Sequence, residues 1–159
     1  MGFYHTAQIC LNGHIINGFL DKYPEHNQNF CNACGAKTIS QCPSCNADIR
    51  GAYEWDFASD DAKVPSYCHN CGKPYPWTQI AIDSTKELIL LNDSASDKEK
   101  EYLNNNVQSL LVDTPKTKVV ATKFKIFLKT ARKEIGTGLK DILVDIISES
   151  AKKIIWPTS

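Results

Sequence analysis

This sequence has no net charge, no long apolar run and no cysteine beyond residue 71. Lysine plus arginine and aspartate plus glutamate both total 18, so the whole chain carries no charge that would draw it to nucleic acid or a membrane. No stretch reaches the ~18 apolar residues of a membrane-spanning helix. The beginning, MGFYHTAQICLNGH, lacks the basic and apolar segments of a secretory signal, so we expect a cytoplasmic protein.

Sequence motifs of catalysis are also missing. The chain contains no glycine-rich phosphate loop, no Gly-x-Ser-x-Gly and no His-Glu-x-x-His. Glu54, Asp56, Asp60 and Asp61 lie close together in sequence and could form an acidic or second metal site. A solvated loop is the simpler interpretation of this cluster, and we expect the protein not to be an enzyme.

The first 71 residues do contain eight residues with metal-ligand spacing. They form four pairs, Cys10 and His14, Cys31 and Cys34, Cys42 and Cys45, and Cys68 and Cys71. One tight turn can offer two such ligands, and two turns complete a four-ligand zinc site. An odd cysteine count without a secretory signal suits a disulfide framework poorly. The spacing therefore predicts two zinc ions per chain, both structural because four protein ligands leave no open position.

Two questions about these ligands stay open in the sequence. We expect His14 to be the fourth ligand of the first site, with His5 and His26 as competitors, and His69 to be a surface residue. The pairs can combine sequentially, first with second and third with fourth, or alternately, as in a cross-braced RING domain. Glycine follows directly after the second and fourth pairs, and this favours the sequential arrangement.

The composition changes near residue 79. Residues 1–79 contain 11 of the 15 aromatic residues but only eight Leu, Ile or Val, whereas residues 80–159 contain 24 of these aliphatic residues. Modules of about 40 residues with so few aliphatics usually need a metal to fold. The sequence thus predicts an α+β protein with zinc ribbon 1 at 1–40, zinc ribbon 2 at 41–79 and an α-helical region at 80–159.

Helical periodicity and capping signals divide the second half. We expect helices at about 79–91, 97–112, 117–135 and 138–155. Ser96 and Glu99 have the spacing of a capping box. Apolar residues repeat at helical spacing from Val120 to Ile135, and we expect Gly136 and Gly138 to separate the last two helices.

Charge is unevenly distributed along the chain. Five Lys or Arg against seven Asp or Glu give residues 1–79 a charge of −2, and seven thiolates on two Zn²⁺ would add −3. This is the wrong sign for phosphate contact, although Trp55 or Trp77 could stack on bases. Residues 116–133 instead hold seven Lys or Arg and no acid. They could meet an acidic protein or lipid surface, nucleic acid, or the acidic segment 93–101 of the same chain. The cations that we expect to make such contacts are Lys118, Lys125, Lys129 and Arg132.

The segments ICLNGH, FCNACGAKT, QCPSCNADIRG and YCHNCGKPYPWT resemble a bacterial family of unknown function with paired zinc ribbons and a helical C-terminal region. The resemblance continues through VDTPKTKVVATKFK and ILVDIISESAKKIIW. It implies a cytosolic zinc protein with eight ligands and no assigned activity. We expect a non-enzymatic adaptor that binds a protein partner or self-associates. The alternatives are a membrane-surface module that uses the C-terminal amphipathic helices and a nucleic-acid-binding ribbon protein.

Overall fold

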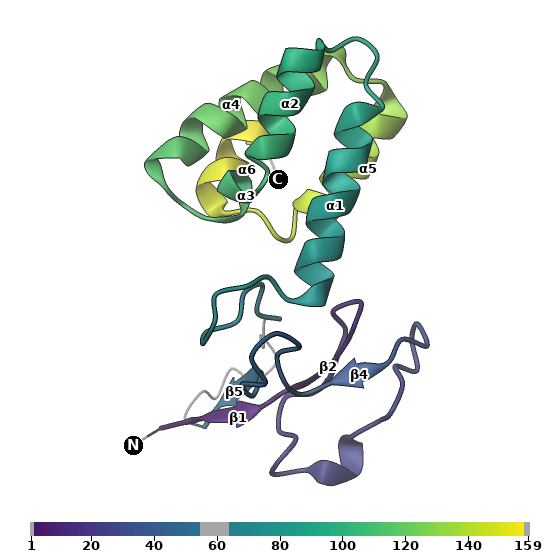
Figure 1. The fold of residues 1–159 in the computed structure, drawn as a ribbon, viewed down its shortest axis with the longest axis vertical. Helices are drawn as coiled ribbons and strands as arrows, with labels where there is room; N and C mark the ends of the chain where they lie inside the picture. The colour runs from purple at the N-terminus through teal and green to yellow at the C-terminus, as the bar shows by residue number, and fades with distance from the viewer. Residues whose placement is uncertain (1, 55–63, 158–159) are drawn as a thin grey trace. The chain divides into compact units, whose positions relative to one another are not determined.

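The computed structural model describes residues 2–54 and 64–157, and these residues form two compact units that divide after residue 80. The predicted α+β class is confirmed, because small antiparallel sheets occupy the first unit and helices the second (Figure 1). Four residues considered above lie outside the described residues, namely Trp55, Asp56, Asp60 and Asp61.

Short strands and one 3-10 helix make up the described part of the first unit. They are β1 (Tyr4–Thr6), β2 (Gln8–Cys10), β3 (Ile15–Asn17), η1 (Pro24–His26), β4 (Thr38–Ile39) and β5 (Arg50–Tyr53). Strand β1 pairs antiparallel with β5 (Figure 1). Strand β2 lies between β3 and β4 in a second antiparallel sheet. The β1–β5 pair therefore joins segments 1–40 and 41–79, which we expected to form separate ribbons.

Residues from both predicted ribbons share one core in this unit. Ile9 of β2, Ile49 just before β5, and Tyr75 are almost completely buried in the same cluster. Cys42 and Cys68 belong to this cluster as well. With so few aliphatic residues available, the cysteines supply part of the buried surface. Two of the predicted metal ligands are consequently part of the core of the first unit.

Helices form the second unit, and the first of them crosses the division between the units. They are α1 (Pro76–Leu90), α2 (Asp97–Asn105), α3 (Gln108–Leu111), α4 (Pro115–Thr130), α5 (Lys133–Leu143) and α6 (Glu149–Ile155). Helix α4 packs against α2, α3 and α6 (Figure 1). Val120 and Phe124 of α4 and Leu139 and Leu143 of α5 are fully buried. None of the helices in the described residues combines the length and apolar character that a membrane crossing needs.

Two helix starts illustrate how local chemistry sets the boundaries. The capping box predicted at Ser96 and Glu99 is confirmed: the Ser96 amide donates to Glu99 Oε2 at 3.1 Å, and the Glu99 amide donates to Ser96 Oγ at 3.2 Å. The helix predicted at 79–91 begins earlier, at Pro76. Proline suits the first turn because its missing amide would have no partner there.

The remaining predicted helices are divided differently in the structure. The segment 97–112 is interrupted at Asn106, whose backbone has φ −124° and ψ 13°. The segment 117–135 breaks at Ala131, which is extended with φ −76° and ψ 146°. Helix α5 then runs through both glycines that we expected to separate the last two helices, and a new break precedes α6, where the Ser148 side chain accepts from the Ala151 amide.

Long-range packing explains two of these differences, the end of α4 and the course of α5. Asn92, which is 1% exposed, donates to Thr130 Oγ1 at 3.2 Å and fixes the end of α4. A Cβ on Gly138 would lie 3.3 Å from Leu88 Cδ1, so the glycine lets α5 approach α1 closely. One glycine costs a helix interior only about 1 kcal/mol. The close packing of α5 against Leu88 therefore outweighs the cost of glycine in this helix.

Candidate metal centres

Three of the four turns that carry the predicted ligands have closely similar backbones. In the three Cys-x2-Cys turns the first cysteine accepts from the amide four residues later, at 2.7–2.9 Å, and donates to the carbonyl five residues later, at 2.8–2.9 Å. The residue after the second cysteine has a positive φ in each turn, namely Gly35 (74°), Asn46 (63°) and Gly72 (76°). Asparagine tolerates this left-handed backbone better than most residues. The glycine pattern therefore did not distinguish the knuckles as we had argued.

The turn that holds His14 depends on a glycine for two reasons. Gly13 has φ +92°, which disfavours other residues, and a Cβ there would lie 3.0 Å from Cβ of Trp77. Trp77 stacks on Tyr75 with ring centroids 4.9 Å apart, and its Nε1 donates to the Pro65 carbonyl at 2.9 Å. The first ligand turn thus packs directly on the aromatic core.

The first ligand group consists of Cys10, His14, Cys31 and Cys34, whose ligand atoms all lie within 4.8 Å of one another. His14 Nδ1 is 3.4 Å from Cys10 Sγ and 3.6 Å from Cys31 Sγ, and the sulfurs of Cys10 and Cys34 are 3.7 Å apart. A tetrahedral zinc with Zn–S of ~2.3 Å and Zn–N of ~2.0–2.1 Å implies S···N edges of ~3.6 Å and S···S edges of ~3.8 Å. The group therefore fits a metal of this size.

The second ligand group consists of Cys42, Cys45, Cys68 and Cys71. The sulfurs of Cys42 and Cys71 are 3.8 Å apart, and those of Cys45 and Cys68 are 3.6 Å apart. These separations also fit tetrahedral thiolate coordination. The structure thus combines the four pairs sequentially and not as a cross-brace.

Burial is distributed in the same way in both groups. The first cysteine of each pair, Cys10, Cys31, Cys42 or Cys68, is at most 3% exposed, whereas Cys34 and Cys71 are exposed. Each group therefore has two ligands anchored in the core and at least one at the surface. A metal bound by either group would therefore lie at the edge of the core.

Two asparagines outside the predicted ligand set support the thiolates. Asn12 lies between Cys10 and His14, and its Nδ2 donates to Cys34 Sγ at 3.3 Å. Asn70 lies between Cys68 and Cys71, and its Nδ2 donates to Cys45 Sγ at 3.5 Å. Each thus links one turn of its group to the other turn. An amide side chain inside a ligand turn was the available sequence signal, and we had not used it.

These hydrogen bonds favour the ionised form that a metal needs. Donation from the Ala36 amide and then from the Asn12 side chain lowers the pKa of Cys34 to about 6. Donation from Asn70 lowers the pKa of Cys45. A thiolate binds metal whereas a thiol does not, so the lower pKa reduces the competition from protons at Cys34 and Cys45.

The other histidines lie outside both groups. Buried His5 donates from Nδ1 to Asp21 Oδ2 at 3.0 Å, and its Nε2 contacts Glu54. Burial alone would lower the pKa of His5, but hydrogen bonds to Glu54 and Asp21 outweigh burial and raise it. His69 Nε2 is 3.2 Å from the Asp48 carbonyl, and His26 packs near Tyr23.

Comparison with known proteins identifies the family of this chain. A search of curated proteins and a search of solved structures each find no match. The family described as "Uncharacterized protein conserved in bacteria (DUF2321)" matches residues 3–155, which include both ligand groups and all the helices. The chain therefore belongs to this bacterial family.

Proposed function

We propose that both ligand groups bind zinc and that the protein is a non-enzymatic adaptor, whose helical unit binds a protein partner. The observation that carries the proposal is the ligand geometry: each group offers four ligand atoms, two of them from buried side chains. Four protein ligands complete the coordination of zinc, so neither ion keeps a position for water or substrate. The metals then serve to fold the first unit.

The donor set supports zinc as the metal. One group offers three sulfurs and one imidazole nitrogen, and the other offers four sulfurs. Magnesium and calcium prefer oxygen ligands, whereas tetrahedral thiolate sites are typical of zinc. The seven thiolates would stay reduced in the cytoplasm, which is where we place the protein.

The exposed cations of α4 support a partner. Lys118, Lys123 and Lys129 are exposed. In residues 93–101 and 116–133, all of which are described, no ion pair joins the acidic segment to the basic helix. The positive charge of α4 is thus available to another molecule.

Affinity purification of the zinc-loaded full-length chain, from a bacterium that encodes it, tests the adaptor. We expect a protein partner in near-stoichiometric amount, identified by mass spectrometry, and absent when an unrelated tagged protein is the bait. Retention of no such protein would contradict the adaptor. So would turnover of a substrate that is lost when a residue outside the ligand groups is replaced.

A further inference from the structure

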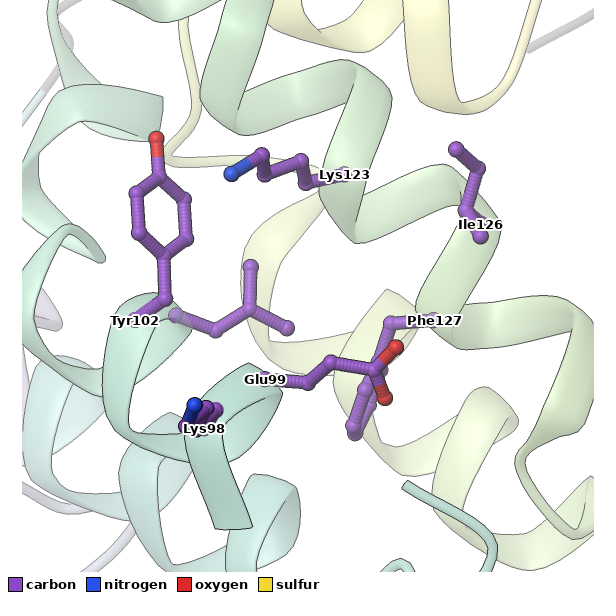
Figure 2. A pocket seen from close by; sticks show the side chains of 7 residues that line it. Lys98, Glu99, Tyr102, Lys123, Ile126 and Phe127 are labelled. Atoms are coloured by element: carbon purple, nitrogen blue, oxygen red, sulfur yellow. The ribbon is translucent and has the colours of Figure 1, made fainter. Parts of the chain in front are cut away.

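A pocket of about 430 Å³ lies between α2 and α4 in the helical unit (Figure 2). Its lining is mostly apolar and includes Leu103 and Phe127, which are both 3% exposed, together with Tyr102 and Ile126. Ile126 is 56% exposed, so an apolar side chain stands at the opening. A pocket of this size and lining can hold an apolar side chain of another molecule.

Lysines at this pocket give it a positive character. Figure 2 shows Lys123 beside the ring of Tyr102, and its Nζ lies 3.8 Å from the ring centroid. This cation–π contact restrains the ammonium at the pocket. Lys98 is also exposed there, and Glu99 already accepts a hydrogen bond from the Ser96 amide. Among the described residues, no carboxylate lies within ion-pair distance of either lysine.

The exposed face of α4 extends this character beyond the pocket. Val119 is 50% exposed and lies two turns before Ile126, with Lys123 between them. Lys116 and Lys129 are exposed farther along the same helix. Apolar and basic side chains therefore alternate along one exposed stripe of α4, which passes the pocket.

We propose that the pocket and the α4 stripe bind an acidic amphipathic helix of a partner protein. One apolar side chain of that helix enters the pocket, and its flanking carboxylates pair with Lys98 and Lys123. We choose an acidic partner because of charge complementarity: Lys98 and Lys123 are exposed at the pocket, and no described carboxylate forms an ion pair with them. This inference rests on the proposed adaptor function and assigns it a surface.

The same observations disfavour a lipid surface as the occupant. A membrane-surface helix inserts a broad apolar face into the lipid. The large apolar residues of α4, Val120, Phe124 and Phe127, are at most 3% exposed because they form the core of the unit. Only Val119 and Ile126 remain exposed on this helix as large apolar residues. A concave pocket also suits a protruding side chain better than a flat bilayer.

Fluorescence anisotropy with a synthetic peptide tests this inference on the full-length protein. The probe is a labelled helix of about four turns, with leucine on one face and glutamate on both flanks. The control peptide has lysine in place of each glutamate. We expect saturable binding of the acidic peptide that weakens as salt rises, and at least about tenfold weaker binding by Lys123→Glu and by Ile126→Ser. Lys153→Glu, an equal charge change at an exposed position on α6, should bind within about twofold of the wild type.

Several outcomes would overturn the assignment. No saturable binding of the acidic peptide up to about 1 mM would do so, and so would equal binding of both peptides. Binding to phosphatidylserine vesicles that Lys123→Glu removes, without peptide binding, would identify a lipid surface. Dimerisation that the same substitution removes would identify a second copy. If a natural partner co-purifies equally well with Lys123→Glu, this surface is wrong and the adaptor stands, whereas retention of no partner rejects the adaptor itself.

Discussion

At the scale of single residues, asparagine has two separate roles around the ligand groups. Asn12 and Asn70 each donate to a thiolate of the opposite turn. Asn46 takes the left-handed backbone that glycine takes in the other two Cys-x2-Cys turns. A short amide side chain can do either, because it hydrogen-bonds locally and tolerates a positive φ. The ligand turns therefore need more than their cysteines.

His5 gives the first unit a pH dependence of its own. Both of its ring nitrogens face carboxylates, so the imidazolium is the form that donates both hydrogen bonds. The pKa of His5 is raised above the ordinary 6.5. Its contribution to the free energy of unfolding is therefore fully present below about pH 6.5 and is lost as pH rises through the folded-state pKa. The pKa values of Asp21 and Glu54 are lowered, so the contributions of these carboxylates to the free energy of unfolding are lost as pH falls through the acidic range.

We predict that His5→Gln removes this dependence. The difference in unfolding free energy between wild type and variant should shrink as pH rises from about 6 to 8, by at most about 1.4 kcal/mol per pH unit for one proton. Urea denaturation of the zinc-loaded proteins measures this difference in unfolding free energy. Because wild type and variant have the same metal ligands, the pH dependence of metal binding cancels when one free energy is subtracted from the other. Exposed His26→Gln is the matched control and should leave the profile unchanged. A constant difference between wild type and His5→Gln across this range would show that His5 does not titrate as argued.

At the scale of elements, local signals predicted what local chemistry decides. The capping box at Ser96 was found because two side chains three residues apart determine it. The division of the eight ligands into four pairs followed from their spacing, whereas the sequential grouping of these pairs was favoured on a glycine pattern that the backbone of Asn46 does not support. The end of α4 at Thr130 was not predictable, because Asn92, which is far away in sequence, fixes it. The course of α5 through two glycines depends likewise on packing against Leu88.

We predict that the two glycines of α5 differ in how well they accept a side chain. Nothing lies within 4 Å of a Cβ placed on Gly136, so Gly136→Ala should stabilise the helix by about 0.5–1 kcal/mol. At Gly138 the added methyl group meets Leu88, so Gly138→Ala should gain less, and Gly138→Val should lower the unfolding free energy by about 1–3 kcal/mol. Thermal unfolding followed by circular dichroism measures all three. Equal stabilisation by alanine at both positions would contradict the close approach of α5 to α1.

At the scale of the whole molecule, the chain combines two ways of building a core. The helical unit buries residues such as Phe124 and Leu139 in a conventional apolar core. The first unit uses Ile9, Ile49 and Tyr75 together with ligand cysteines. The compositional change near residue 79 predicted this difference, because aliphatic content limits how much surface can be buried without a metal. It did not predict the shared core and the β1–β5 pair, which bring together strands far apart in sequence.

The presence of ligand cysteines in the core of the first unit leads to a prediction for metal removal. We expect two zinc ions per chain by elemental analysis, and loss of amide-exchange protection in the described residues up to 80 after chelation, with protection retained from 81 onward. Cys45→Ser should bind one zinc and destabilise both ligand groups, because Ile9, the neighbour of the first-group ligand Cys10, shares a core with Cys42 and Cys68. Ser44→Ala in the same turn, an exposed non-ligand position, should keep both ions. If chelation left the protection of the first unit intact, the core would stand without its metals and the structural role would be wrong. Loss of protection throughout the chain would instead show that the helical core also depends on the zinc-bound unit.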